Sequence, residues 1–420
     1  MPAGVINLPA TSRTSVTTRM DDAVTLNDIR AARDVAGAVA RHTPVVSSAA
    51  LSERFGRSVV LKAENLQRTG AFKIRGAMNK LATLGADARF GVTAGSAGNH
   101  AQAIAFAAQY FGVPCDIFVP SGAPITKIEA CRSYGANVIE GGASLVEALA
   151  SSLAFAESDG RAFCHPFDDP AVVAGQGTLG LELVEDLDDL RCVVVPLGGG
   201  GLAGGVAIAV KTLMPHVRVV GVQASACAPY TGMAVGLGAL ATLADGIAVK
   251  SPGVVTRPLV ERWVDDIVTV DEGAIADAMV MLMDRAKLYV EGAGAVGVAA
   301  LQSGVVEPID GGTTCAVLSG GNVDLGVVPG LIRRHENTAG RRLVLFAKID
   351  DRPGALVKFL AVFGNNGANL IEVEHQREGV DLSVRQTGVH ATFEVRGPDH
   401  AELVVAAARA AGFAELRVEG

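Results

Sequence analysis

One alternation constrains the fold of this chain more than any other feature. From about residue 23 to 325, short β-branched runs alternate with longer alanine-rich stretches. This alternation is typical of βαβ units, so we expect an α/β fold with a mostly parallel sheet. The expected strands are 58–61, 116–119, 137–139, 191–196, 217–223 and 314–318, and the expected helices include 98–110, 125–134, 145–158 and 201–214.

The two ends of the chain have other patterns. Residues 1–22 are rich in Ser and Thr and lack an apolar signal segment, so they predict a flexible tail. The α/β domain is expected over 23–328, and a linker over 329–341, where the apolar pattern breaks. Residues 342–420 follow the order strand, helix, strand, strand, helix, strand, which predicts a small βαββαβ ferredoxin-like domain.

Composition excludes several classes of function. The net charge is -8, which argues against nucleic acid or an anionic membrane surface as the main partner. No uninterrupted apolar run is long enough to span a bilayer. The six cysteines form no CxxC pair, so we expect reduced thiols in a cytoplasmic protein and no disulfide scaffold or zinc site.

The clearest chemical signal is a glycine-rich turn. The apolar run 193–196 leads into four consecutive glycines, Gly198 to Gly201, and then into a helix. Glycine lets the backbone approach a ligand closely, and the N–H groups at a helix start bind phosphate. The same turn contains GxGxxG, which raises the hypothesis of an NAD-dependent oxidoreductase. That hypothesis needs an acidic residue at the end of the next strand, where this chain has Gln223 and Ala224.

Three other segments carry weaker signals when taken alone. Lys73 has apolar neighbours and opens a predicted helix, and burial or the nearby Arg75 could make it nucleophilic, although a surface lysine is the simpler interpretation. Ser96 lies in a small-residue turn before a helix, which suits either a carboxylate ligand or tight packing. Ser319 follows a strand, where an ordinary helix N-cap is the simpler interpretation.

In this order, the four segments resemble the threonine/serine dehydratases, which are fold-type II pyridoxal phosphate (PLP) enzymes of the tryptophan-synthase-β-like family. From Lys62 to Ala77 the chain reads Lys-x-Glu-x-x-Gln-x-Thr-Gly-x-Phe-Lys-x-Arg-Gly-Ala, which matches the family's PLP-lysine motif. The resemblance extends from about Val24 onward. It implies two open, mostly parallel sheets with helices on both faces, and a smaller subdomain of roughly 63–162 inserted in the larger one.

The resemblance also implies residue roles. Lys73 is expected to hold PLP as a Schiff base and to act as base at Cα, with Phe72 beside the ring. Asn99 is expected to bind the cofactor's 3'-oxygen, and Ser319 the pyridine nitrogen. The residues expected to bind the cofactor phosphate are Gly198, Gly199, Gly200, Gly201 and Leu202. Those expected to bind the substrate carboxylate are Ser96, Ala97, Gly98, Asn99 and His100.

The implied reaction is β-elimination of water from a small hydroxy amino acid, followed by hydrolysis to a 2-oxo acid and ammonia. L-Threonine is the expected substrate, with side activity on L-serine. A dehydratase that acts mainly on serine stays open, because one methyl group is worth only about 1–3 kcal/mol of discrimination. A non-catalytic amino-acid sensor is disfavoured by the intact Lys73, Asn99 and Ser319.

Departures from related families refine this expectation. Ala97 stands where serine racemases have a second serine that acts as an acid on the opposite face. The segment 223–229 is poor in the oxygen ligands that those racemases use for a divalent metal. Both differences favour a dehydratase without an essential divalent metal. Glu291 opens Glu-Gly-Ala-Gly-Ala, where the family often has Glu-Pro-Ala-Gly-Ala, and we expect it only to support the site.

The C-terminal segments 351–356 and 367–375 resemble an ACT domain. The resemblance implies a regulatory unit that binds an amino-acid or nucleotide effector, in a homodimer or homotetramer. A dimerisation module that binds nothing is the alternative.

Overall fold

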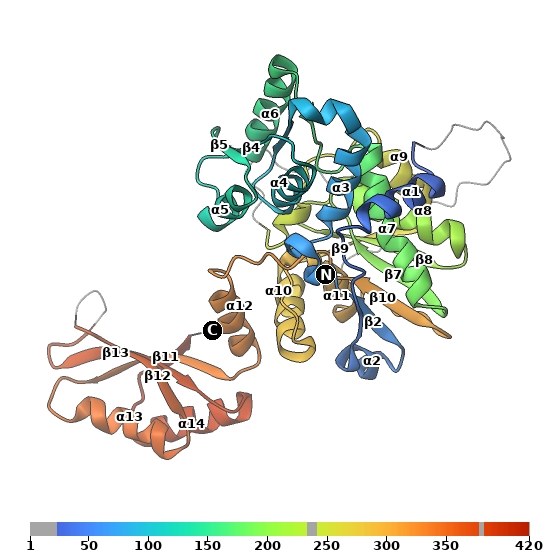
Figure 1. Cartoon of the computed structure of the whole chain (residues 1–420). Coiled ribbons are helices and arrows are strands. Elements are labelled where there is room, and N and C mark those ends of the chain that lie inside the picture. The colour runs from blue at the N-terminus through green and yellow to red at the C-terminus, as the bar shows by residue number, and fades with distance from the viewer. Residues whose placement is uncertain (1–22, 233–241, 378–381, 420) are drawn as a thin grey trace. The chain divides into compact units, whose positions relative to one another are not determined.

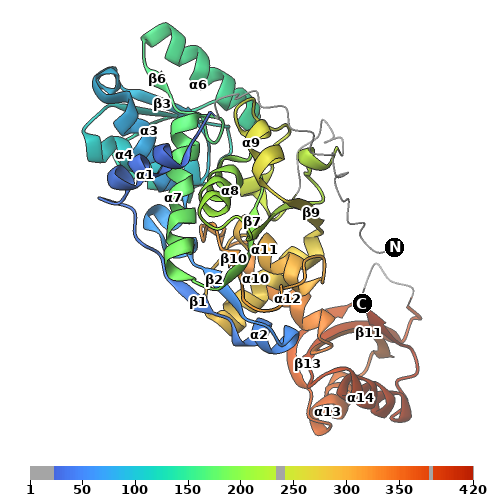
Figure 2. The same ribbon diagram turned by 90° about the vertical axis from the view of Figure 1, so that its right-hand side faces the viewer.

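The computed structural model describes residues 23–232, 242–377 and 382–419. The tail predicted over residues 1–22 lies outside this description. The chain divides into two compact units between Val323 and Asp324 (Figures 1 and 2).

A six-stranded sheet forms the larger part of the first unit, with the strand order β1-β2-β10-β7-β8-β9. Only the edge strand β1 is antiparallel to its neighbour, and the other pairs are parallel. Strand β10 is buried along its whole length, as a strand covered on both faces must be. The predicted parallel α/β fold is therefore confirmed. The strands are β1 (Val45–Ser47), β2 (Val59–Lys62), β7 (Leu190–Pro196), β8 (Arg218–Ala224), β9 (Asp266–Val270) and β10 (Thr313–Val317).

A second sheet of four parallel strands lies between β2 and β7 in the chain, in the order β5-β4-β3-β6. Its strands are β3 (Val92–Gly95), β4 (Cys115–Val119), β5 (Asn137–Glu140) and β6 (Ala162–Phe163). Each sheet has its own apolar core: α3 and α4 pack on the smaller sheet, and α7 and α8 on the larger one. In sheets of this kind, ligands bind outside the carboxyl ends of the parallel strands.

Helices surround both sheets, and α7 contacts α8, α3 and α1. Small residues let these helices pack closely: a Cβ on Gly175 would lie 2.6 Å from the Cα of Gly76. The α-helices of this unit are α1 (Leu26–Ala36), α2 (Ala49–Phe55), α3 (Lys73–Leu84), α4 (Asn99–Phe111), α5 (Ile125–Ser133), α6 (Leu145–Asp159), α7 (Pro170–Asp186), α8 (Gly201–Leu213), α9 (Thr256–Trp263), α10 (Glu272–Met281) and α11 (Gly292–Gln302).

The second unit contains a four-stranded antiparallel sheet in the order β12-β13-β11-β14, with α13 and α14 on one face (Figure 1). The chain order βαββαβ and this strand order confirm the predicted ferredoxin-like domain. Its elements are β11 (Arg342–Asp350), α13 (Ala355–Asn365), β12 (Asn369–Gln376), β13 (Gln386–Glu394), α14 (Pro398–Ala410) and β14 (Leu416–Glu419).

The segment expected to be a linker, residues 329–341, requires a correction. It is mostly helical, because α12 spans Val328–Thr338, and it belongs to the second unit, which begins at Asp324. Val328 and Leu331 are buried while the rest of the helix is largely exposed. An amphipathic helix with a short apolar stripe therefore looks in sequence like a break in the apolar pattern.

Among the described residues, no helix is both long and apolar enough to cross a membrane. Within the same ranges, no group of three or more His, Cys, Asp and Glu side chains is arranged to hold a metal ion.

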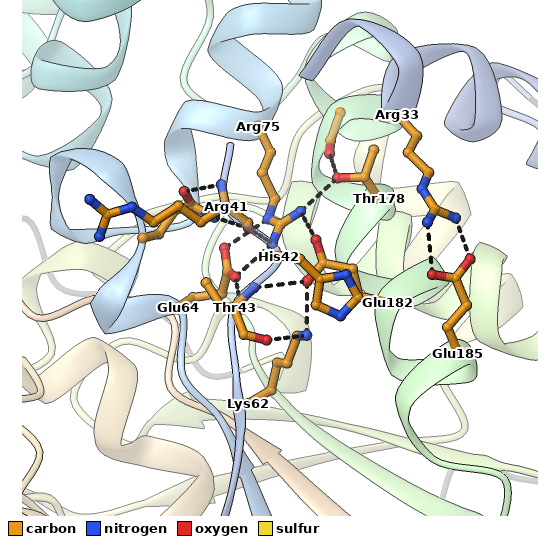
Figure 3. Close-up of polar contacts among 12 residues, drawn as sticks. Arg33, Arg41, His42, Thr43, Lys62, Glu64, Arg75, Thr178, Glu182 and Glu185 are labelled. Atoms are coloured by element: carbon orange, nitrogen blue, oxygen red, sulfur yellow. Dashed lines mark hydrogen bonds and ion pairs between the residues drawn. The ribbon is translucent and has the colours of Figure 1, made fainter. Parts of the chain in front are cut away.

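A buried ion cluster joins α3 to the rest of the first unit (Figure 3). The guanidinium of Arg75, on α3, binds both carboxylate oxygens of Glu64 at 2.8 Å each and the Glu182 carboxylate at 2.6 Å. Lys62 on β2 completes the cluster, since its Nζ lies 2.8 Å from Glu182 and 2.9 Å from Asp186. Burial alone lowers the pKa of Arg75, but the Glu64 and Glu182 carboxylates outweigh it and hold that pKa above its ordinary value.

We predict that Arg75→Met strongly destabilises the first unit. The change leaves the buried Glu64 carboxylate without its cation, and breaking such a pair costs about 3–5 kcal/mol. Urea unfolding followed by the fluorescence of Trp263, the only tryptophan of the chain, measures the effect in this unit.

Arg33→Met provides the matched control. Arg33 pairs with Glu185 in the same region, but both side chains are more than two-fifths exposed. Its loss should cost about 1 kcal/mol or less, as is usual for surface pairs. Equal losses in the two variants would show that burial of the Arg75 cluster contributes nothing.

Candidate active site

The glycine-rich turn lies at the carboxyl end of β7 and leads into α8. It packs so tightly that side chains do not fit: a Cβ on Gly199 would lie 2.3 Å from the ring of Phe167, and one on Gly198 would lie 2.9 Å from the Cα of Ile247. Gly200 has φ +97°, which favours glycine. The first N–H groups of α8 have no partner within the helix, so the turn suits an anion.

Neighbouring side chains hold this turn in place. The carbonyl oxygen of Gly199 accepts hydrogen bonds from Thr256 Oγ1 at 2.6 Å and from Tyr230 Oη at 3.3 Å. The Asp168 carboxylate accepts from the backbone N–H of Thr256 at 3.0 Å. The side chain of Leu202 packs in the apolar core of the larger sheet, so only its backbone is available to a ligand.

Lys73 is the first residue of α3, as the sequence predicts, and it is half-buried. Its Nζ donates to the carbonyl oxygen of Pro166 at 2.7 Å and lies 5.1 Å from the centre of the Phe72 ring. Burial lowers the pKa of Lys73 to about 8, although the Glu291 carboxylate acts in the opposite direction. This environment favours the nucleophilic lysine over the simpler surface interpretation.

The predicted carboxylate loop joins β3 to α4. Ser96 Oγ accepts a hydrogen bond from the Gly98 N–H at 3.2 Å, and the space beside Gly98 is open for 4 Å. The His100 side chain, however, is buried and donates from Nε2 to the Cys164 carbonyl at 2.8 Å. Burial lowers the pKa of His100 to about 3, so its ring is neutral and only its backbone is available to a ligand.

The turn after β10 brings Ser319 against residues 70–72, which immediately precede Lys73. The backbone N–H of Phe72 donates to the Ser319 carbonyl at 3.0 Å, and the backbone N–H of Gly321 donates to the Gly70 carbonyl at 2.8 Å. The segment just before Lys73 is therefore held along the turn that contains Ser319.

The structure adds Asn322, which had no predicted role, and shows which contacts Glu291 makes. Asn322 Nδ2 donates to Asn99 Oδ1 at 2.7 Å, and Asn99 Nδ2 donates to Glu291 Oε1 at 2.7 Å. Burial and the nearby Asp245 raise the pKa of Glu291 to about 7. The unusual Glu-Gly-Ala-Gly-Ala run signalled Glu291, but nothing in the sequence distinguished Asn322 from an ordinary turn residue.

A second group without a predicted role lies in the loop 164–169, which follows β6. Its Pro166 carbonyl receives Lys73, and its Phe167 ring packs against Gly199. The Pro and Asp residues of this loop indicate a turn, but the sequence does not show what the turn touches.

The site combines a lysine of lowered pKa, a glycine turn at a helix N-terminus, and a loop with open space beside Gly98. These groups fit PLP, whose aldehyde needs an amine and whose phosphate needs N–H donors. They do not suit a dinucleotide: Gln223 is buried and bridges the Leu197 carbonyl and the Tyr230 N–H, at 3.2 Å each, so it does not face a ribose.

Comparison with known proteins agrees with this chemistry. The family model described as "Pyridoxal-phosphate dependent enzyme" matches residues 38–320. The chain belongs to this family. Its cofactor is pyridoxal phosphate, and the expected fold-type II architecture is confirmed.

Relatives of this PLP enzyme include proteins that match nearly all of it. An L-threonine ammonia-lyase of Thermotoga maritima is 43% identical over 403 residues, covering 94% of this chain and 100% of the relative. The structure of a threonine deaminase from Solanum lycopersicum has a TM-score of 0.69 and 32% identity, covering 79% of this chain and 96% of that one. A maize serine racemase has a TM-score of 0.69 and 34% identity, with coverages of 75% and 99%.

We predict that cofactor uptake by the PLP-free enzyme depends on the ionisation of Lys73. Only the neutral amine attacks an aldehyde, and a lowered pKa makes that form available at lower pH. The rate of covalent uptake should rise with pH and level off above about 8, not near the ordinary lysine value of 10.5. Stopped-flow absorbance measures this rate.

Glu291→Gln tests the sign of the electrostatic effect. It removes the carboxylate that raises the Lys73 pKa, so the pH midpoint of uptake should move down. A midpoint that stays near 10 in both proteins would contradict the assignment of Lys73.

Proposed function

We propose that this chain is an L-threonine ammonia-lyase, which eliminates water from threonine and releases 2-oxobutanoate and ammonia. The observation that carries the proposal is that the loop 164–169 contacts both Lys73, whose pKa is lowered, and the glycine turn that suits the cofactor phosphate. The full-length similarity to a protein named L-threonine ammonia-lyase supports the choice of reaction.

Each part of the site has a role in this proposal. PLP supplies an electron sink that acidifies the proton at the substrate Cα. Lys73 would attach the cofactor and accept that proton, because its lowered pKa makes the neutral amine more accessible near physiological pH than in an ordinary lysine. The backbone N–H groups of residues 198–202 hold the phosphate, Asn99 binds the 3'-oxygen, Ser319 binds the ring nitrogen, and Phe72 lies beside the ring.

The carboxylate loop decides between elimination and racemisation. The backbone donors of residues 96–100 and the Ser96 hydroxyl hold the substrate carboxylate at the start of α4. Ala97 has no proton to deliver from the opposite face, although the chain also resembles a serine racemase. The loop therefore favours elimination.

Lys73→Ala tests the function directly. We expect no covalent PLP and a loss of at least about a thousandfold in 2-oxobutanoate release from threonine, since base and attachment point are lost together. A coupled 2-oxo acid assay measures the rate, and the exposed Lys358→Ala serves as control. Wild-type activity in Lys73→Ala would exclude this mechanism.

Serine remains the rival substrate. A kcat/KM higher for serine than for threonine would make the chain mainly an L-serine dehydratase. No described side chain separates a pocket that accepts the threonine methyl from one that rejects it.

For the second unit we propose regulation by an amino acid. A cavity of about 320 Å³ lies at its first βα turn, lined by residues 349–357, His375 and Arg377. Both signs of charge line it, including Asp351 and Arg377, which suits a zwitterion better than a nucleotide. Gly354, with φ +82°, lets the backbone turn beside this cavity.

Arg377→Ala tests the regulatory proposal. Arg377 lines the cavity and pairs with Asp351 at 3.1 Å, so its guanidinium would bind an effector carboxylate by sharing or exchanging that partner. Its loss should raise the effector concentration for half-maximal response at least about tenfold. The rate is measured with isoleucine, valine and nucleotides, and the exposed Arg409→Ala is the control. A wild-type rate that no amino acid changes would leave assembly as the role of this unit.

We also propose a homodimer or homotetramer in the cytoplasm. Strand β12 is an edge strand and exposes Leu370, Ile371 and Val373, which suits contact with another copy. All six cysteines are free and buried, as is common in a reducing compartment. Sedimentation at several concentrations measures the assembly.

A further inference from the structure

Three side chains from three different segments form a continuous hydrogen-bonded series beside Lys73. Asn322, after β10, donates from Nδ2 to Asn99 Oδ1 at 2.7 Å. Asn99, at the start of α4, donates from Nδ2 to Glu291 Oε1 at 2.7 Å. Glu291 immediately precedes α11. The series ends at the Thr69 carbonyl, which accepts from the same Asn322 Nδ2 at 2.8 Å.

This series determines which way each amide points. The Thr69 carbonyl can only accept, so the Asn322 atom beside it must be the nitrogen. That nitrogen has a second hydrogen, which makes the Asn99 atom facing it the oxygen. The Asn99 nitrogen is therefore directed to the Glu291 side, and one hydrogen remains on it after the bond to Glu291.

The backbone around the series is shaped to hold it. A Cβ on Gly70 would lie 2.3 Å from Asn322 Oδ1, and a Cβ on Gly320 would lie 2.3 Å from Glu291 Oε1. Thr69 itself has φ +59°, a region that non-glycine residues rarely occupy and that persists where the surroundings enforce it. The absence of side chains at Gly70 and Gly320 leaves room for Asn322 and Glu291, and the surroundings hold Thr69 in a rare backbone conformation beside them.

We propose that Asn322 and Glu291 are positioning residues that lock the Asn99 amide so that its nitrogen donates to the cofactor's 3'-oxygen. The inference rests on the proposed role of Asn99. With the amide free to rotate by 180°, its carbonyl oxygen would face the 3'-oxygen, and two acceptors would repel each other. The two flanking side chains remove that orientation before the cofactor binds.

The variant Asn322→Asp tests the lock with almost no change in shape. An ionised aspartate cannot donate to either Thr69 or Asn99, so Asn99 loses its fixed orientation. We expect the dissociation constant for PLP to rise about tenfold, the value of one hydrogen bond to a charged group. We also expect the absorption spectrum of the bound cofactor to shift, because the 3'-oxygen has lost its donor.

A double-mutant cycle with Asn99→Ala separates positioning from a general structural effect. If Asn322 acts through Asn99, Asn322→Asp should change cofactor affinity and spectrum by less than about twofold once Asn99 is alanine. Glu291→Gln, which keeps an accepting oxygen, should retain near-normal affinity, whereas Glu291→Ala should not. Asn79→Asp is the control, since Asn79 is a buried asparagine on α3 whose side chain bonds only to the Ala171 carbonyl in the described contacts.

The outcomes are distinguishable. Equal effects of Asn322→Asp in both backgrounds, or the same spectral shift in Asn79→Asp, would overturn the lock and leave the proposed site intact. An Asn99→Ala variant with unchanged cofactor affinity and spectrum would overturn the role of Asn99, and the lock with it. Loss of 2-oxobutanoate release with normal cofactor binding would instead concern the proposed reaction and not the lock.

Discussion

The position of Lys73 depends on a buried cation two residues further along the same helix. Arg75 is buried and is held by carboxylates from two other segments, Glu64 before α3 and Glu182 on α7. Burying a guanidinium is unfavourable unless its donors are satisfied, so α3 can occupy essentially one position against α7. Lys73 opens that helix, and its amine is thereby delivered to the Pro166 carbonyl rather than to solvent.

Opposing forces set the ionisation of the site. Burial removes water from both Lys73 and Glu291, which lowers the pKa of the amine and raises that of the acid. Their mutual attraction opposes both shifts. The two groups therefore titrate near neutrality. At such a pKa, a lysine gains or loses a proton near physiological pH at a small cost in free energy. Asn99 carries no charge, but its amide joins Glu291 to Asn322 by hydrogen bonds to both side chains.

The sequence predicted much of the fold because the decisive patterns are local. Alternation predicts parallel strands, and the glycine turn after β7 must bend closely whatever surrounds it. The role of Lys73 required the order of four segments and a family resemblance. Contacts between distant segments could not be predicted. The roles of Asn322 and Phe167 depend on their contacts with Asn99 and Gly199, which lie far away in the chain. Helix α12 was missed because its buried stripe is narrow, and the buried His100 ring looked like part of an open loop.

The loop 164–169 has a consequence for how substrate reaches the site. It carries the chain from the smaller sheet back to the larger one, and it contacts Lys73 through Pro166 and the glycine turn through Phe167. A hinge motion that separated the two sheets would have to break at least one of these contacts. The space beside Gly98 is open for 4 Å, so a movement confined to the loop between β3 and α4 would leave both contacts intact.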